Sequence, residues 1–134
     1  MGKPLRFHEY TPKWEQDFKE IHDYLDRFLG NLILTIHHVG STSVKELGAK
    51  PIIDVDIEYE HYFDEIKRLL VQNDYLFEGE KGITGRYSFR FLKDTLPEHH
   101  LYVIHSNQEE LHKHITFRDT LRTFPMYRKQ YHEL

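Results

Sequence analysis

The sequence predicts an α/β (α+β) fold in which a mixed β-sheet is covered by packed helices. Two kinds of hydrophobic pattern alternate along the 134 residues: stripes with helical spacing, and short runs rich in β-branched and aromatic residues. In order, they give one helix, two strands, a second helix, three strands and a third helix. Because no repeat or low-complexity linker interrupts this order, we expect residues 1–134 to form a single domain.

The first half of the chain predicts an amphipathic helix followed by two strands. Soon after Pro12, apolar residues recur every three or four positions, which is typical of a helix with proline near its start. This stripe comprises Trp14, Phe18, Ile21, Leu25 and Phe28. The Gly-Asn pair at 30–31 can end the helix. The runs at 32–39 and 52–58 are short, apolar and β-branched, as expected of strands.

The second half predicts a helix, three strands and a final helix. A helical stripe at 62–70 is followed by "NDYLF", a turn that leads into a short strand. In 86–91, aromatic residues alternate with Arg, Ser and Arg, which indicates a half-buried strand with a basic outer face. "HHLYVI" at 99–104 predicts the last strand. Ser106 or Asn107 could cap a final helix. The apolar residues of that helix are Leu111, Ile115, Leu121 and Phe124.

Composition narrows the possible functions. With 18 Lys and Arg against 22 Asp and Glu, the formal charge is −4, so we expect no general nucleic-acid binding. There is no cysteine, which excludes disulfides, thiolate zinc sites and a cysteine nucleophile, and which fits a cytoplasmic protein. No stretch approaches the roughly 20 apolar residues of a membrane span, so we expect no membrane insertion.

Two aspartates in the second predicted strand suggest a cation site. Side chains two positions apart in a strand share a face, so Asp54 and Asp56 point together, away from the face of their aliphatic neighbours. Two adjacent carboxylates repel each other unless a cation, a shared proton or strong donors compensate. Mg²⁺ takes such oxygens together with substrate phosphates, which indicates metal-assisted phosphoryl or nucleotidyl transfer. The alternative is a polar sheet face without a bound ion.

The segment "GSTS" precedes these aspartates and could hold phosphates. Gly40 permits a tight backbone approach, and Ser43 with Glu46 matches the capping box that opens a helix. Backbone N–H groups at a helix start bind anions, so phosphates could lie against Gly40, Ser41, Thr42 and Ser43. The alternative is a turn with good capping residues. The two motifs in succession favour a phosphotransfer site over coincidence.

Four segments resemble the GrpB family, which is itself similar to nucleotidyltransferases of the DNA polymerase β-like superfamily. They are "HHVGSTSVKELGAKPIIDVDI", "GITGRYSFR", "EHHLYVI" and "FRDTLRTFP". The resemblance implies a nucleotidyltransferase fold, with Gly40 and Ser41 in the phosphate-holding turn and Asp54 and Asp56 as Mg²⁺ ligands. The family's usual "HHLHV" reads "HHLYV" here, so Tyr102 replaces a histidine that would share a strand face with His100.

Other residues could support this chemistry. Nucleotidyltransferases of that superfamily often add a third carboxylate from a later strand. The corresponding stretch here offers His100, which could act as a base or a ligand or be an ordinary strand histidine. Candidates for holding phosphate are Arg86, Arg90, Arg118, Arg122 and Lys50. Surface ion pairs such as Arg118 with Asp119, and a solvated loop lysine, are the alternatives. A zinc site is disfavoured, although histidine pairs occur at His37-His38 and His99-His100. Adjacent strand residues face opposite sides of the sheet, so each pair offers at most one ligand to a given site.

We therefore expect a Mg²⁺-dependent nucleotidyltransferase that moves a nucleotidyl group from a nucleoside triphosphate to an acceptor hydroxyl. The acceptor is a small molecule or a protein that the sequence does not identify. The alternative is a catalytically inactive module of the same fold that binds a nucleotide or a CoA-like ligand. It is motivated by the missing third carboxylate and by Tyr102.

Overall fold

The computed structural model describes residues 10–44 and 51–124. Its elements are α1 (Lys13–Leu29), the 3₁₀ turn η1 (Gly30–Leu32), β1 (Thr35–Val39), the 3₁₀ turn η2 (Ser41–Ser43), β2 (Ile53–Tyr59), α2 (Phe63–Gln72), β3 (Tyr75–Gly79), β4 (Arg86–Phe91), β5 (His99–His105) and α3 (Glu109–Thr123). The order of α-helices and strands predicted from the sequence is confirmed in these residues. A mixed sheet with packed helices is therefore the architecture, as predicted.

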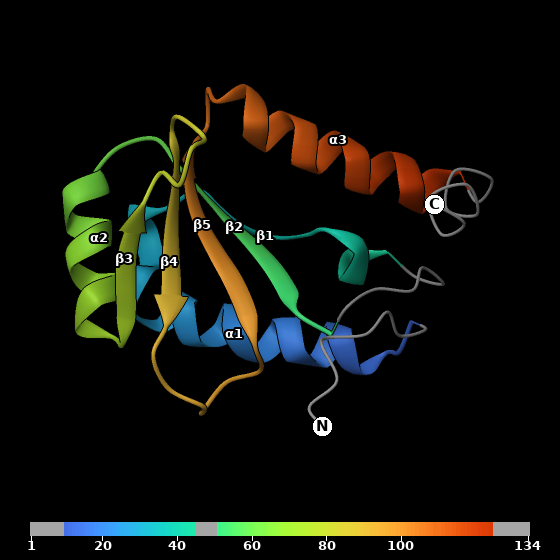
Figure 1. The fold of residues 1–134 in the computed structure, drawn as a ribbon, viewed down its shortest axis with the longest axis horizontal. Helices are drawn as coiled ribbons and strands as arrows, with labels where there is room; N and C mark the ends of the chain where they lie inside the picture. The colour runs from blue at the N-terminus through green and yellow to red at the C-terminus, as the bar shows by residue number, and fades with distance from the viewer. Residues whose placement is uncertain (1–9, 45–50, 125–134) are drawn as a thin grey trace.

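The five strands form one sheet in the order β1-β2-β5-β4-β3 (Figure 1). β2 and β5 run parallel, and the other neighbouring pairs are antiparallel. The neighbouring inner strands β2 and β5 therefore come from distant parts of the sequence, and they bring "DVD" beside "HHLYV". The edge strands β1 and β3 lie on opposite sides of these inner strands.

The main core lies between the sheet and the helices α1 and α2. Ile53, Val55 and Ile57 of β2 are buried there, as their alternation with the aspartates predicted. Ile21 of α1 and Ile66 of α2 pack in the same cluster, and neither is exposed to solvent. Figure 1 shows α1 passing behind the sheet, while α3 crosses above it. α3 contacts β1 and β5, so the sheet face that carries the aspartates lies toward α3.

Several predicted boundaries need correction. The first strand begins at Thr35 rather than at residue 32, because the chain after Gly30 makes the short turn η1. Pairing with β2 starts where Leu34 N–H donates to the Glu58 carbonyl, at 2.9 Å. The predicted capping box between Ser43 and residue 46 stays a prediction; the Ser43 hydroxyl donates to the Gly40 carbonyl at 2.6 Å. Glu46 lies outside the described residues.

The final helix differs from its prediction in two ways. It begins at Glu109, after Gln108, and neither Ser106 nor Asn107 caps it with a side chain. Instead, Asn107 N–H donates to His105 Nδ1 at 3.0 Å. Phe124, predicted to be on the buried stripe, follows the helix and is 50% exposed. The apolar stripe is therefore short, and polar side chains make much of the contact between α3 and the sheet.

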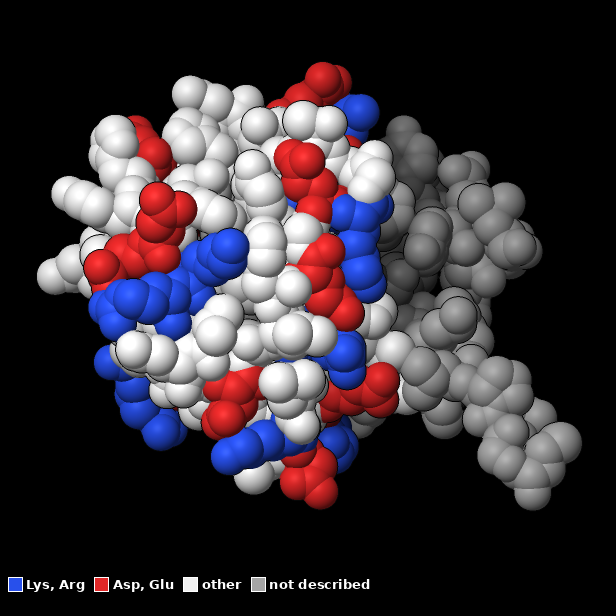
Figure 2. All heavy atoms as spheres, turned by 60° about the vertical axis from the view of Figure 1, so that its left-hand side comes forward, with Lys and Arg blue, Asp and Glu red and all other residues white. Residues whose placement is uncertain are grey.

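Charged residues are mixed in sign over the face drawn in Figure 2. Lys and Arg alternate there with Asp and Glu, and the described residues of this face show no broad area of one sign. Within the described residues, no helix is both long enough and apolar enough to cross a membrane.

Candidate functional site

Asp54 and Asp56 lie on one face of β2, an inner strand of the sheet between β1 and β5. Asp54 is opposite Val39 of β1 and His100 of β5, and Asp56 is opposite His37 and Tyr102. Asp54 is partly exposed, whereas Asp56 is fully buried. The two carboxylates are therefore neighbours on a half-covered surface, as the strand periodicity predicted.

The turn after β1 comes very close to Asp54, and this explains why it contains glycine. Gly40 has φ +72°, a conformation that L side chains rarely adopt. A Cβ built on Gly40 would lie 2.3 Å from Asp54 Oδ2. Both the backbone conformation and the space therefore require glycine here. The predicted proximity of the "GSTS" turn to the first aspartate is present in the structure.

The rest of this turn is held by bonds within the protein. The Thr42 side chain is buried, and its hydroxyl shares a hydrogen bond of 2.9 Å with His38 Nε2. Ser43 is buried, and both its N–H and its hydroxyl donate to Gly40 O. The Thr42 and Ser43 hydroxyls are thus used to shape the turn. Gly40 is the part of "GSTS" that lines the cavity described below.

Each aspartate pairs with a histidine from another element. His100 Nδ1 of β5 lies 3.1 Å from Asp54 Oδ1, and His114 Nδ1 of α3 lies 2.5 Å from Asp56 Oδ2. The hydrogen bond to each carboxylate raises the pKa of the histidine above its ordinary value, against the opposing effect of burial. His114 also contacts Glu110, at 3.2 Å. The histidines supply the compensation that two neighbouring carboxylates need.

His114 was not among the predicted site residues, although the sequence contains a signal for it. It lies three residues after Leu111 and four before Arg118, so it continues the stripe of α3 that faces the sheet. From this helix the sequence indicated only the apolar residues and, as phosphate ligands, Arg118 and Arg122. In the structure it is His114 of this stripe that pairs with the buried carboxylate of Asp56.

A cavity of about 450 Å³ opens over the aspartates, between the sheet and α3. It is lined by Val39, Gly40, Asp54, Asp56, Arg86, Tyr102, Lys113, His114 and Phe117. The Arg86 guanidinium lies over the Tyr102 ring, 4.3 Å from its centroid. Arg86 Nε is buried and has no hydrogen-bond partner in the structure as described. The cavity thus combines two carboxylates, a guanidinium with an unused donor, and aromatic walls.

The other predicted basic residues lie elsewhere. Arg118 donates to His38 O at 3.3 Å and to Asp119 Oδ1 at 3.0 Å, and Arg122 donates to Ser43 O at 2.9 Å. Both anchor α3 to β1 and η2 rather than lining the cavity. Arg90 pairs with Glu78, at 3.1 Å. His100 and Arg90 line a smaller, neighbouring pocket. Lys50 lies outside the described residues.

The carboxylates suit a hard cation that brings its own waters. Within residues 10–44 and 51–124, no three metal-binding side chains form a cluster that could hold an ion by themselves. Asp56 Oδ1 is buried and has no hydrogen-bond partner in that part of the chain. Mg²⁺ usually keeps several waters and uses one or two carboxylates together with substrate phosphates. Asp54 and Asp56 fit that mode of binding.

Comparison with known proteins identifies the family. The family profile described as GrpB protein matches residues 4–134. The chain belongs to the GrpB family. It is 36% identical over 127 residues to YqkA of Bacillus subtilis, a match that covers 91% of this chain and 36% of YqkA. It is 28% identical over 131 residues to the glutamate-rich protein GrpB of Alkalihalophilus pseudofirmus, covering 93% and 75%. The chain thus spans about a third of YqkA.

Solved structures support the same assignment and extend it to the fold. The crystal structure of the conserved protein GrpB from Enterococcus faecalis matches with a TM-score of 0.83 and 32% identity, covering 96% of this chain and 79% of that one. Cid1, solved in complex with its short product ApU, matches with a TM-score of 0.55 and 11% identity, covering 85% and 37%. At that identity the second likeness concerns the fold alone, which is nucleotidyltransferase-like.

Proposed function

We propose that this GrpB domain binds a nucleoside triphosphate with Mg²⁺ and transfers its nucleotidyl group to an acceptor hydroxyl. The observation that carries the proposal is the position of Asp54 and Asp56, side by side at a cavity wall and next to the Gly40 turn. The nucleotidyltransferase-like fold, shared with a protein whose structure contains the nucleotide product ApU, supports it.

The protein groups would act mainly by positioning and by balancing charge. Asp54 and Asp56 would hold the cation, and the turn at Gly40 packs against the Asp54 carboxylate and lines the same cavity. The unused Nε–H of Arg86 can donate to a phosphate oxygen, and the positive guanidinium attracts the negatively charged triphosphate. When bound, Mg²⁺ would neutralise phosphate charge and polarise the phosphorus under attack.

In the reaction, the acceptor oxygen forms a bond to the α-phosphorus while the bond from that phosphorus to the pyrophosphate oxygen breaks. Pyrophosphate leaves with the bonding electrons, and the acceptor proton passes to solvent. α3 covers Asp56 through His114, so it limits the access of water to this part of the cavity.

A binding module without turnover is the second candidate. It is favoured by the residues of β5 beside the aspartates, which are His100 and Tyr102, where a third carboxylate would otherwise complete the site. Such a module would still bind Mg²⁺ and nucleotide through the same cavity. The two candidates therefore differ in product formation, and they share the binding experiment below.

The experiment is thermal unfolding with each ribonucleoside triphosphate, with and without Mg²⁺. Ligand at 100 times its Kd stabilises the folded state by about 2.7 kcal/mol, which raises the Tm of a domain of this size by several degrees. We expect a rise that requires Mg²⁺ in the wild type and is absent in Asp54→Asn. Asp64→Asn, in the first turn of α2 away from the cavity, is the matched control and keeps the rise. A cooperative transition that no nucleotide shifts contradicts the proposal.

A further inference from the structure

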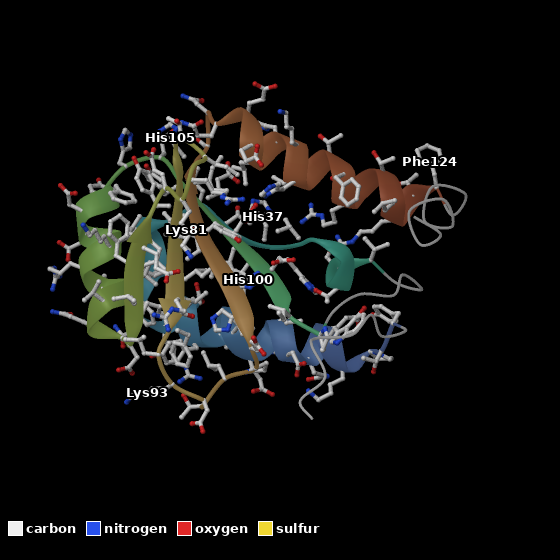
Figure 3. The ribbon with its side chains drawn as sticks, in the orientation of Figure 1. His37, Lys81, Lys93, His100, His105 and Phe124 are labelled. Atoms are coloured by element: carbon white, nitrogen blue, oxygen red, sulfur yellow. The ribbon has the colours of Figure 1, made fainter. Side chains whose placement is uncertain are left out.

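A second, smaller pocket lies beside the main cavity on the same face of the sheet. It has a volume of about 220 Å³ and is formed over β4 and β5, where Arg86 and Tyr102 form a wall shared with the main cavity. Figure 3 labels His100 and Lys81, which contribute to it from β5 and from the β3–β4 connection. Its position makes it a compartment adjacent to the carboxylates.

The floor of this pocket contains a buried hydroxyl without a partner. Ser88 is 4% exposed and lies directly opposite Tyr102 in the β4–β5 ladder. Its Oγ makes no hydrogen bond within the described part of the chain. Buried polar groups in proteins are normally hydrogen bonded, so an unpaired hydroxyl at a pocket wall indicates a site for an exogenous polar group.

The charge of the pocket favours an anion. Three cationic side chains, Lys81, Arg86 and Arg90, line it together with one carboxylate, Glu78. Lys81 and Arg90 both pair with that carboxylate, each at 3.1 Å. Arg86 has its Nε–H unused. A ligand that enters therefore meets an excess of positive charge and one polar group, Ser88 Oγ, that needs a partner, while the unused Nε–H of Arg86 serves the nucleotide in the main cavity.

The pocket is connected to the transfer site through His100. His100 lines the second pocket, and its Nδ1 lies 3.1 Å from Asp54 Oδ1, which belongs to the main cavity. Arg86 and Tyr102 line both pockets, so a small molecule in the second pocket would lie next to a nucleotide bound in the main cavity.

We propose that this second pocket, built on Ser88 and rimmed by Lys81 and Arg90, is the acceptor subsite, and that it takes a small polyol or sugar bearing an anionic oxygen group. The inference rests on the proposed nucleotidyl transfer and names the substrate class of that site. The anionic group binds at the cationic rim, and one hydroxyl of the acceptor forms the new bond to the α-phosphorus as pyrophosphate departs. The hydroxyl proton passes to solvent.

The test uses α-glycerol phosphate as the probe, titrated into the isotope-labelled full chain and followed by amide NMR. Glycerol and inorganic phosphate, titrated separately, distinguish the hydroxyl and the anion contributions. We expect α-glycerol phosphate to shift the amides of Ser88 and Tyr102 and to bind more tightly than either fragment. Ser88→Ala and Arg90→Gln should each weaken it by about tenfold, the effect of losing one hydrogen bond to a charged group.

Matched controls are Ser106→Ala and Arg68→Gln, which change the same residue types outside both cavities and should bind the probe as the wild type does. The same variants are also melted with Mg²⁺ and nucleotide, since Ser88→Ala should leave nucleotide binding intact. Three results overturn the inference: Ser88→Ala binds the probe as tightly as the wild type does, the amide shifts are confined to Val39 and Gly40, or the wild type binds no probe at millimolar concentration. If the protein binds the probe at Ser88 but binds no nucleotide, the acceptor role and the proposed function are both overturned. If it binds nucleotide but not the probe, the acceptor subsite alone is overturned.

Discussion

Removing the His114 side chain should destabilise the protein in a way that Mg²⁺ reverses. Asp56 is fully buried, its Oδ2 is 2.5 Å from His114 Nδ1, and its Oδ1 has no hydrogen-bond partner in the described residues. Deleting one member of a buried charge pair costs about 3–5 kcal/mol. Because 24% of the His114 side chain is exposed and water can reach it through the cavity, we expect about 2–3 kcal/mol for His114→Ala.

The assay is thermal unfolding near neutral pH, with and without Mg²⁺. A loss of this size lowers the Tm of a domain of about this length by about 10 °C. His112→Ala is the matched control: His112 is an exposed histidine of the same helix, and its Nε2 contacts only the Ser106 carbonyl, at 2.9 Å, among the contacts of the described residues. His112→Ala should change the free energy of unfolding by no more than about 1 kcal/mol.

Mg²⁺ should raise the Tm of His114→Ala by more than it raises that of the wild type. In the variant the cation takes over the role of the missing partner of Asp56, whereas in the wild type the histidine already compensates that carboxylate. The reasoning is refuted if His114→Ala melts within a degree or two of His112→Ala, or if Mg²⁺ shifts the variant and the wild type equally.

Two further predictions concern the turn that approaches Asp54. Gly40→Ala should lower the free energy of unfolding, measured by urea titration, by about 2–3 kcal/mol, because it adds both left-handed backbone strain and a close contact with Asp54. Gly79→Ala is the control, since Gly79 has φ +73° and a Cβ there would meet no atom within 4 Å, so that this variant should show the strain alone. Equal losses of unfolding free energy in the two variants would contradict the close approach of Gly40 to Asp54. Burial lowers the pKa of His38 from the ordinary 6.5 to about 4, so the unfolded chain binds the proton first as pH falls, and stability is lost between these two values. As the pH falls from roughly 7 to 5, the free energy of unfolding of His38→Gln should therefore drop by about 2 kcal/mol less than that of the wild type. If the two proteins give parallel curves of unfolding free energy against pH, His38 is not the group responsible.

The fold was predictable because its signals are local. Alternation in "DVD" correctly assigned the aliphatic face of β2, since a strand with one buried face repeats every two residues. In 86–91 it correctly placed Phe89 in the core, but Ser88 of the predicted outer face is buried as well. The ends of elements were less predictable. The first strand was placed three residues too early because the apolar run at 32–34 is continuous with it, and backbone geometry after Gly30 decides where the pairing starts.

The site was predictable in part. The nearness of Gly40 to Asp54 follows from the two motifs and is present in the structure. The pairing of Asp56 with His114 depends on how α3 crosses the sheet, which no local pattern encodes. Arg118 and Arg122 were predicted as candidates for holding phosphate, but they donate to backbone carbonyls of β1 and η2. Residue type alone cannot distinguish a guanidinium that anchors a helix from one that binds phosphate.

The most direct test of nucleotidyl transfer is to follow a label from the α-phosphorus of a nucleoside triphosphate into an acceptor. The wild-type chain is incubated with Mg²⁺, labelled nucleotide and a pool of small phosphorylated and carboxylated polyols, and the products are separated. We predict a labelled, Mg²⁺-dependent product with equimolar pyrophosphate, absent in Asp54→Asn and present in Asp64→Asn. A wild-type protein that binds nucleotide with Mg²⁺ but transfers no label to any acceptor pool contradicts the account and identifies the domain as a binding module.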